Sequence, residues 1–390
     1  MFNKFNIIFF VPLLFVLIPL VPLSINGTPD QVFQLLKALL FSLGVFIFIL
    51  NSKLNNTSFY ISILLFFIGL ISSFICIYYY KISINLITLI SFFIIFCSYS
   101  IHFRDDINII STYALKILSL ISVILAFYFL YFPSIQFNLY SWNSSNLEFS
   151  QQLFFFESKL PISIYGLYTL SSSIYFIFSL FWLHQFYLKR SIWSILNVTI
   201  FLFFLYDTYD QVKSLQALLC IMLFSIILII YFNDMFLKNK KLLRIFFFSI
   251  LLLIASILTI NFFDLILTND GLTNRFSIED NASYLYNALN FIFLGLGYGN
   301  IIYDISGIKL SLGDMNQADL IIRFSLIGLL LYYCIIYFFL KNNLHNIKFL
   351  VIPLFVSIFL MDLGHSVSRS IHFLPIFYLY IISINKGYMQ

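Results

Sequence analysis

Blocks of apolar residues alternate with polar stretches along the whole chain, and twelve such blocks can be marked. Most are close to the ~20 apolar residues that an α-helix needs to cross the hydrocarbon core of a bilayer. The pattern predicts an all-α fold, a polytopic membrane helix bundle of about 12 transmembrane helices that forms a single domain over residues 1–390. The predicted spans are 7–23, 32–50, 58–80, 82–101, 113–132, 162–188, 192–206, 215–232, 245–263, 320–340, 349–362 and 371–385.

The charges between these blocks are sorted by sign. With the N-terminus inside, the inner connections carry most of the Lys and Arg residues and only three carboxylates, Asp105, Asp106 and Asp234. The positive-inside rule then places both termini in the cytoplasm. The outer connections are mainly acidic, and the longest of them, residues 264–319, is predicted to be one large loop outside the cytoplasm.

Composition supports a membrane protein. Hydrophobic residues make up 62% of the chain and charged residues only 9%, which is too little charge for a water-soluble surface. The net charge of +5 is explained by inner loops that face an anionic leaflet, so we do not expect nucleic acid as a partner. All four cysteines fall inside predicted spans, and neither a disulfide framework nor a metal site is expected.

Polar residues inside or beside the spans predict local structure. Lys37 and Lys116 lie one to two turns inside their spans, and we expect their ammonium groups to snorkel to the nearer surface. Residues 207–214 predict a short polar hairpin between two spans. Its charges have two open interpretations, as snorkelling ends of the spans or as contacts to a ligand.

The large outer loop contains the most informative local pattern. Arg275 is followed by a predicted helix over 281–293, whose apolar residues recur at helical spacing. Three glycines then alternate along the chain and allow a tight backbone turn; they are Gly295, Gly297 and Gly299. No strand precedes this turn and no Gly-Lys-Ser/Thr follows it, which argues against a nucleotide-binding loop.

This order of features resembles the bacterial O-antigen polymerase and O-antigen ligase group, the Wzy and WaaL types. The resemblance covers about residues 270–330 and rests on Arg275, the helix, the Leu-Gly-x-Gly-x-Gly turn and the Ser325-Leu-Ile-Gly328 segment of the next span. Lys213-Ser214 also stands where the family often has a basic residue followed by Ser or Thr. Ligases usually carry His fourteen residues before the last Gly, where this chain has Asp314, and this departure favours the polymerase branch.

The resemblance implies a glycosyltransferase of the bacterial inner membrane. Such a polymerase joins undecaprenyl-diphosphate-linked oligosaccharide repeat units at the periplasmic face, where residues 264–319 form the large periplasmic loop. It implies a lipid-linked glycan donor and acceptor as partners and no cofactor, and it leaves open whether a chain-length regulator protein binds. Two alternatives stay open. One is a ligase that transfers glycan to lipid A-core, and the other is a flippase or transporter, which should carry intramembrane charges along a central path.

The chemistry of this transfer selects residue types. Negative charge develops on the diphosphate leaving group, and a guanidinium or ammonium group in a partly dehydrated site stabilises it. The candidates for this contact are Arg275 first, then Lys213, Arg323 and Arg369. A carboxylate or imidazole should accept the proton of the attacking hydroxyl, and the candidates are Asp314 and His365.

Three of these candidates, Arg323, His365 and Arg369, also have a purely structural interpretation. Asp319 and Arg323 are four residues apart in a predicted helix, so they are equally compatible with a plain ion pair. His365 and Arg369 lie between the last two spans, where a solvated turn is the alternative to a site.

The charge sorting makes a topological prediction. Reporter fusions near Lys240 and Lys348 should be active as cytoplasmic fusions, and fusions near Asn143 and Asp304 as periplasmic ones. Paired alkaline phosphatase and fluorescent protein fusions at each site measure this. The orientation is wrong if the fusion at Asp304 is active only inside the cell.

Overall fold

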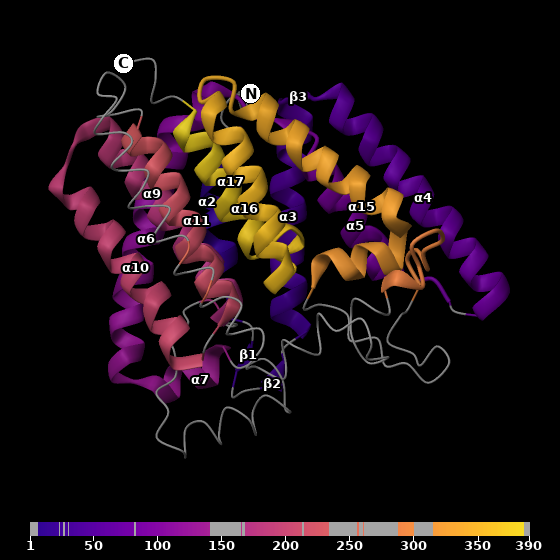
Figure 1. Ribbon diagram of the computed structural model, residues 1–390, viewed down its shortest axis with the longest axis horizontal. Helices are drawn as coiled ribbons and strands as arrows, with labels where there is room; N and C mark the ends of the chain where they lie inside the picture. Colours follow the sequence, from indigo (N-terminus) through magenta and orange to yellow (C-terminus); the bar gives the residue numbers. More distant parts are fainter. Residues whose placement is uncertain are drawn as a thin grey trace. The chain divides into compact units, whose positions relative to one another are not determined.

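A computed structural model describes residues 7–22, 24–25, 28–29, 31–81, 83–140, 165, 168–212, 214–233, 256, 260, 288–299 and 315–385. Helices make up most of this part of the chain (Figure 1). The described strands are two very short antiparallel pairs. They are β1 (Ser24–Ile25) with β2 (Thr28–Pro29), and β3 (Lys53–Leu54) with β4 (Ile101–His102).

Six of the described helices are long and apolar enough to cross a membrane. They are α3 (Gln31–Asn51), α4 (Asn56–Tyr80), α6 (Asn108–Tyr131), α10 (Ile192–Val212), α11 (Leu215–Phe232) and α15 (Asn316–Asn343). The other described helices are α2 (Phe10–Leu20), α5 (Leu86–Ser98), α7 (Pro133–Tyr140), α9 (Tyr168–Lys189), α16 (Val351–Gly364), α17 (Phe373–Ile384) and the 3-10 turns η1 (Asp105–Ile107), η3 (Lys348–Leu350) and η4 (Val367–Arg369). The fold is therefore all-α and of the multi-pass membrane class, as the apolar blocks predict.

Helix α4 shows why these helices suit a bilayer. Its large side chains recur every three or four residues and are 51–68% exposed; they are Tyr60, Leu64, Phe67, Ile71 and Phe74. Its buried residues include small polar ones, namely Ser58, Ser62, Ser72 and Ser73. Lipid tails accept such an apolar outer stripe, and small inner residues let helices approach closely.

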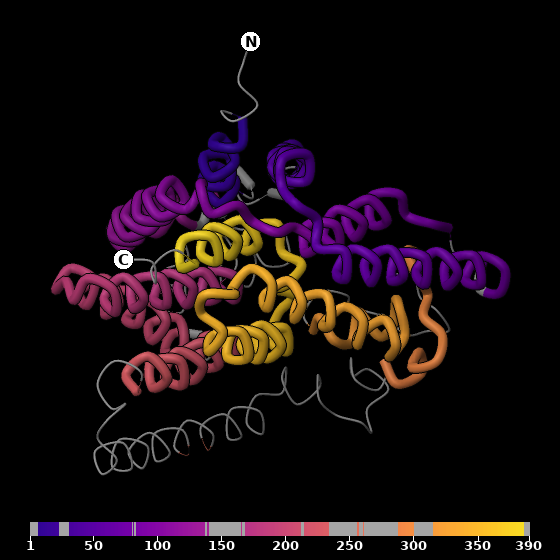
Figure 2. Tube along the Cα trace, turned by 90° about the horizontal axis from the view of Figure 1, so that it is seen from above, coloured from indigo at the N-terminus to yellow at the C-terminus, as the bar shows by residue number. Residues whose placement is uncertain are grey.

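The chain forms two compact units, and the first comprises residues 1–47, 104–262 and 370–390. Its centre is α17, because all twelve residues of this helix are buried and it packs on α2, α6 and α9. Figure 2 shows α17 between α6 and α9. Helices α10 and α11 pack on α9 and on each other.

The second unit comprises residues 48–103 and 263–369. Its longest described helix, α15, packs on α4 and α16. Helix α15 is interrupted at Ser325, whose backbone has φ 66° and ψ 178°. A non-glycine residue costs about 1–3 kcal/mol in this region of backbone space, so the surroundings must hold it there. The candidate functional site lies in this unit.

Two local expectations differ from the structure. Lys37 is only 2% exposed and does not snorkel; its Nζ lies 3.2 Å from Nδ1 of His372, because α3 packs here on α2 and α17. The predicted hairpin 207–214 is mostly helical, since α10 continues to Val212 and Ser214 already caps α11 through the N–H of Ala217. No glycine or proline interrupts residues 207–212, which explains the longer helix.

Candidate functional site

A buried ion pair begins the site in the first two turns of α15. Asp319 and Arg323 are four residues apart and therefore lie on one face of the helix. The Nε of Arg323 donates to Oδ1 of Asp319 at 3.0 Å. Only 4% of Asp319 and 8% of Arg323 are exposed. The ion pair expected from the spacing is confirmed, but its burial exceeds that of an ordinary surface pair.

A second guanidinium group reaches the same carboxylate. Arg369, the last residue of η4, donates from Nη1 to Oδ2 of Asp319 and from Nη2 to Oγ of Ser366. Both guanidinium groups lie over the ring of Phe92, at 5.6 Å for Arg323 and 5.2 Å for Arg369 from its centroid. Asp319, Arg323 and Arg369 are called the arginine cluster below. These three residues together carry one net positive charge.

The charge state of Arg369 follows from its surroundings. Burial by itself lowers the pKa of the Arg369 guanidinium, but the negative charge of Asp319 more than offsets this effect and the pKa is raised. Arg369 therefore stays cationic at neutral pH.

The glycine turn fits into the interruption of α15. The N–H of Leu296 donates to the carbonyl of Ile322 at 2.8 Å, and the N–H of Gly297 donates to the carbonyl of Arg323 at 2.7 Å. In return, the N–H of Leu326 donates to the carbonyl of Ile292 at 2.9 Å. In a continuous helix these backbone groups of α15 would bond to each other. Because the helix is interrupted at Ser325, they form hydrogen bonds with the glycine turn instead.

Glycine is required in the turn for steric reasons. A Cβ at Gly295 would overlap the Arg323 carbonyl, and a Cβ at Gly297 would overlap the Gly69 carbonyl and the Ser73 hydroxyl. Gly297 also has φ +63°, which other residues adopt only with strain. This close approach lets Nη1 of Arg323 reach two carbonyls of the turn, those of Gly297 at 3.3 Å and of Gly299 at 3.4 Å.

A second carboxylate holds the segment that carries Arg369. Asp362 is fully buried near the end of α16 and accepts four hydrogen bonds. The donors are Nδ2 of Asn316 at 2.7 Å, the Tyr333 hydroxyl at 2.9 Å, and the N–H and Oγ of Ser368 at 2.9 and 2.6 Å. The network therefore joins α15 and α16 to the residue that precedes Arg369.

Two further tyrosines fix Ser368. The hydroxyl of Tyr99 donates to the Ser368 carbonyl at 2.6 Å, and that of Tyr332 contacts the same carbonyl at 3.1 Å and Oγ at 2.9 Å. With both main-chain groups and its side chain bonded, Ser368 has little freedom. The guanidinium group of the next residue is therefore presented to Asp319 from a rigid segment.

Several buried polar atoms of this region have no hydrogen-bond partner among the described residues. They are Nε of Arg369, Oδ1 of Asn316 and Oε1 of Gln317. Nearly all buried polar atoms in proteins are paired, so two unpaired acceptors on the adjacent residues Asn316 and Gln317 are unusual. The N-terminus of α15 also has no side-chain cap, because Met315 occupies that position. A polar group that both donates and accepts hydrogen bonds would find one donor, Nε of Arg369, and two acceptors beside a helix N-terminus here.

The structure brings some of the site residues predicted from the sequence together and does not describe others. Arg323 and Arg369 are brought together on Asp319, and Gly295, Gly297 and Gly299 lie against Arg323. His365 is the C-terminal cap of α16, four residues before Arg369. The solvated-turn interpretation of 362–369 is wrong, since Asp362 and Ser368 are fully buried. Arg275, Asp314 and Lys213 lie outside the described residues.

Sequence reasoning did not single out Asp362, Asn316 or Phe92 as parts of the site. Asp362 stands at the outer end of the predicted span 349–362. Sequence reasoning could have used this signal, because charged side chains within a membrane span are expensive. Nothing in the local pattern distinguishes Phe92 from the many other phenylalanines. In the described chain, no group of three or more His, Cys, Asp or Glu residues is placed to hold a metal ion.

The glycine turn makes a stability prediction. Replacing Gly297 by Ala should destabilise the protein by about 2 kcal/mol or more, because its φ is positive and the added Cβ meets backbone atoms. Thermal unfolding in detergent micelles measures this. The control is Leu294→Ala in the same turn, where the side chain is 47% exposed and a much smaller change is expected. Equal melting temperatures for the two variants would contradict the packing argument.

The Asp362 network makes a second prediction. Asp362→Asn should cost about 1–3 kcal/mol, since an amide NH₂ would face groups that are themselves donors. The matched control is Ser357→Ala, because Ser357 is buried on the same helix and bonds only the Pro353 carbonyl of its own helix. Melting curves of both variants decide the point, and a wild-type curve for Asp362→Asn would rule out the network as a structural anchor.

The arrangement can bind and stabilise negative charge. Two guanidinium groups lie in a region with little water, where each of their hydrogen bonds is stronger than at a surface. Asp319 orients both of them, and a helix N-terminus lies two turns or less away. Comparison of the chain with protein-family models, with curated proteins and with solved structures finds no match.

Proposed function

We propose that this protein is an O-antigen polymerase of the bacterial inner membrane. It joins oligosaccharide repeat units carried on undecaprenyl diphosphate, at the periplasmic face. The observation that carries the proposal is the arginine cluster, in which two buried guanidinium groups share one carboxylate beside a glycine turn. A diphosphate leaving group needs this kind of cationic, partly dehydrated environment. The order of motifs around the turn supports the same family.

The proposed reaction is a glycosyl transfer between two lipid-linked glycans. A hydroxyl of the acceptor glycan attacks the anomeric carbon of the donor, the bond from that carbon to the diphosphate oxygen breaks, and the diphosphate leaves on its lipid. Arg369 and Arg323, together with Arg275, stabilise the charge that develops on the leaving group. Asp314 or His365 accepts the proton of the attacking hydroxyl. Lys213 is a further candidate for contact with the diphosphate.

The proposal includes a topology. The chain crosses the membrane twelve times, both termini lie in the cytoplasm, and residues 264–319 form the large periplasmic loop. Lipid-linked substrates then reach the site laterally from the bilayer, and a chain-length regulator binds from the same membrane. The charge sorting of the connections and the exposed apolar stripes of the described helices support this part of the proposal.

A second candidate function is export of the lipid-linked glycan by a flippase or transporter. The observation that favours it is the burial of charged residues on apolar helices. Lys37 on α3 contacts His372, and Asp319 and Arg323 lie on α15. Intramembrane ionisable residues often mark a transport path. The gathering of most of these charges in one cluster, with a rigid supporting network, favours the enzyme.

A surface-glycan ladder tests the function. In a deletion strain, a ladder reduced to one repeat unit on the core means polymerase. Bare core with long chains kept on the lipid carrier means ligase, and absence of repeat units outside the cell means flippase. Complementation by the wild-type gene must restore the normal ladder.

The arginine cluster is tested in the same strain. Arg369→Ala should lower polymerisation by roughly 10²–10³ and abolish long chains, whereas Arg369→Lys should retain part of the activity because the charge survives. Arg104→Ala is the control, since Arg104 forms an exposed ion pair with Asp106. Protein level and melting temperature are measured for each variant. Full-length ladders from a stable Arg369→Ala protein would remove Arg369 from the site.

A further inference from the structure

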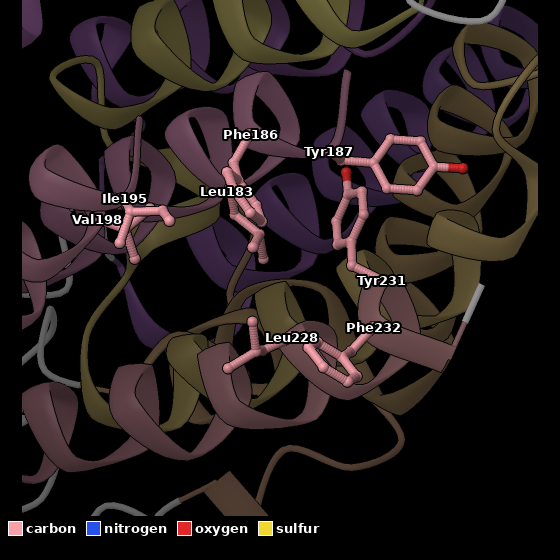
Figure 3. A pocket seen from close by; sticks show the side chains of 8 residues that line it. All are labelled: Leu183, Phe186, Tyr187, Ile195, Val198, Leu228, Tyr231 and Phe232. Carbon is pink, nitrogen blue, oxygen red and sulfur yellow. The ribbon is translucent and has the colours of Figure 1, made fainter. Parts of the chain in front are cut away.

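An apolar pocket lies among three helices of the first unit, α9, α10 and α11. Its volume is about 170 Å³, and Figure 3 shows the side chains that line it. They include Leu183 and Tyr187 from α9, Val198 from α10, and Leu228 and Phe232 from α11. The wall is apolar throughout, so water has no partners in it. The proposed glycosyl transfer does not use this pocket.

The pocket lies at one end of the three helices. Its residues belong to the last turns of α9 and α11 and to the first turns of α10. Tyr187 and Tyr231, whose ring centroids are 5.3 Å apart, are the polar-tipped residues at this end. Tyr231 bonds Nδ1 of His184 at 2.9 Å, so its hydroxyl is already paired. Tyrosines at the end of apolar helices are typical of the level of lipid headgroups.

Cations lie beside the pocket at this same end. Lys189 is the last residue of α9, exposed and one turn beyond Phe186 of the pocket wall. Its ammonium group is close enough to that of Lys116 on α6 for the two charges to repel each other. Trp182 of α9 donates to Ser119 of α6 at 3.2 Å and holds the two helices together here.

The two lysines lack a counter-charge in the described part of the chain. The ion pairs of the described residues include those of Arg104, Arg323 and Arg369, and none involves Lys116 or Lys189. Lys116 instead lies 5.7 Å from the ring centroid of Tyr113. Two like charges held together at a membrane surface are stabilised by an anion between them. The sequence places this end in the cytoplasmic leaflet, which is rich in anionic lipid.

We propose that the pocket is a binding site for an anionic phospholipid. One acyl chain fills the cavity among α9, α10 and α11, and the phosphate lies against Lys189 and Lys116. The size fits a short stretch of hydrocarbon, since an apolar cavity of about 150 Å³ holds a benzene molecule. The charges select the headgroup, and the apolar wall excludes soluble polar ligands.

Native mass spectrometry tests the site directly. The full-length protein is incubated in micelles with phosphatidylglycerol or with phosphatidylcholine, and the retained lipids are counted. We expect one tightly retained phosphatidylglycerol and much weaker retention of phosphatidylcholine. Each ammonium group should contribute about fivefold in affinity. Equal retention of the two lipids, or retention of neither, overturns the proposal.

Two sets of variants test the acyl-chain contact and the headgroup contact of the proposed lipid separately. Val198→Phe fills the pocket and should remove the retained lipid, with Leu228→Phe as the second variant if the first does not fold. Ile226→Phe is the control, because Ile226 is 43% exposed on the same helix as Leu228 but does not line the pocket. Loss of the lipid from Ile226→Phe as well, or from none of the three, contradicts the site.

The headgroup contact has its own matched control. The double variant Lys116→Gln with Lys189→Gln should lower phosphatidylglycerol affinity roughly 25-fold and leave phosphatidylcholine unchanged. The control double variant is Lys53→Gln with Lys341→Gln, which removes two cations elsewhere; Lys341 also lies over an aromatic ring, at 6.0 Å from Phe338. An unchanged preference in the first double variant overturns the assignment of the phosphate to these lysines.

Discussion

The carboxylate of Asp319, buried between two guanidinium groups, constrains the rest of the second unit. A buried charge is costly unless it is paired, and removing one partner of such a pair typically costs about 3–5 kcal/mol. Arg323 comes from the same helix, but Arg369 comes from a segment fifty residues later. The end of α16, the turn η4 and the first turns of α15 must therefore meet at one place. Hydrogen bonds of Ser368 with Asp362, Tyr99 and Tyr332 make this arrangement rigid.

The interruption of α15 depends on the same residues. Within a membrane, every backbone N–H and C=O needs a partner inside the protein. Ser325 leaves the carbonyls of Ile322 and Arg323 without their helical donors, and the N–H groups of Leu296 and Gly297 take that place. The carbonyls of Gly297 and Gly299 in the glycine turn accept hydrogen bonds from Nη1 of the Arg323 side chain. The glycine turn, the interrupted helix and the arginine cluster thus form one hydrogen-bonded unit, which explains why the turn has no room for side chains.

Apolar surface is used in two different ways in this protein. On α4 a stripe of large apolar side chains faces outward, and the buried side includes four serines beside Leu65 and Cys76. The pocket among α9, α10 and α11 is a local recess in such a surface. In a bilayer the hydrophobic effect does not drive helices together, so small residues, hydrogen bonds and lipid contacts carry more of the packing. The buried serines and tyrosines of the second unit are consistent with that balance.

The amino-acid sequence by itself located most of the long helices, although α10 continues through residues 207–212 where a hairpin was expected. Eleven of the twelve apolar blocks contain a described helix, and the remaining block, 245–263, lies almost wholly outside the described residues. The sequence also predicted the Asp319–Arg323 pair and a tight glycine turn, because both depend on the spacing of residues within one segment. The roles of Arg275, Asp314 and Lys213 stay predictions.

Only the tertiary structure decided which distant groups meet. The pairing of Arg369 with Asp319, the four donors on Asp362 and the contact of Lys37 with His372 join residues that no local period relates. Snorkelling was expected for Lys37 because a lone helix offers its lysine a path to the surface, and packing of α3 on α2 and α17 removes that path. The interruption at Ser325 likewise needs the glycine turn beside it. Helix formation is set by neighbouring residues, whereas the pairing of buried charges is set by which elements pack together.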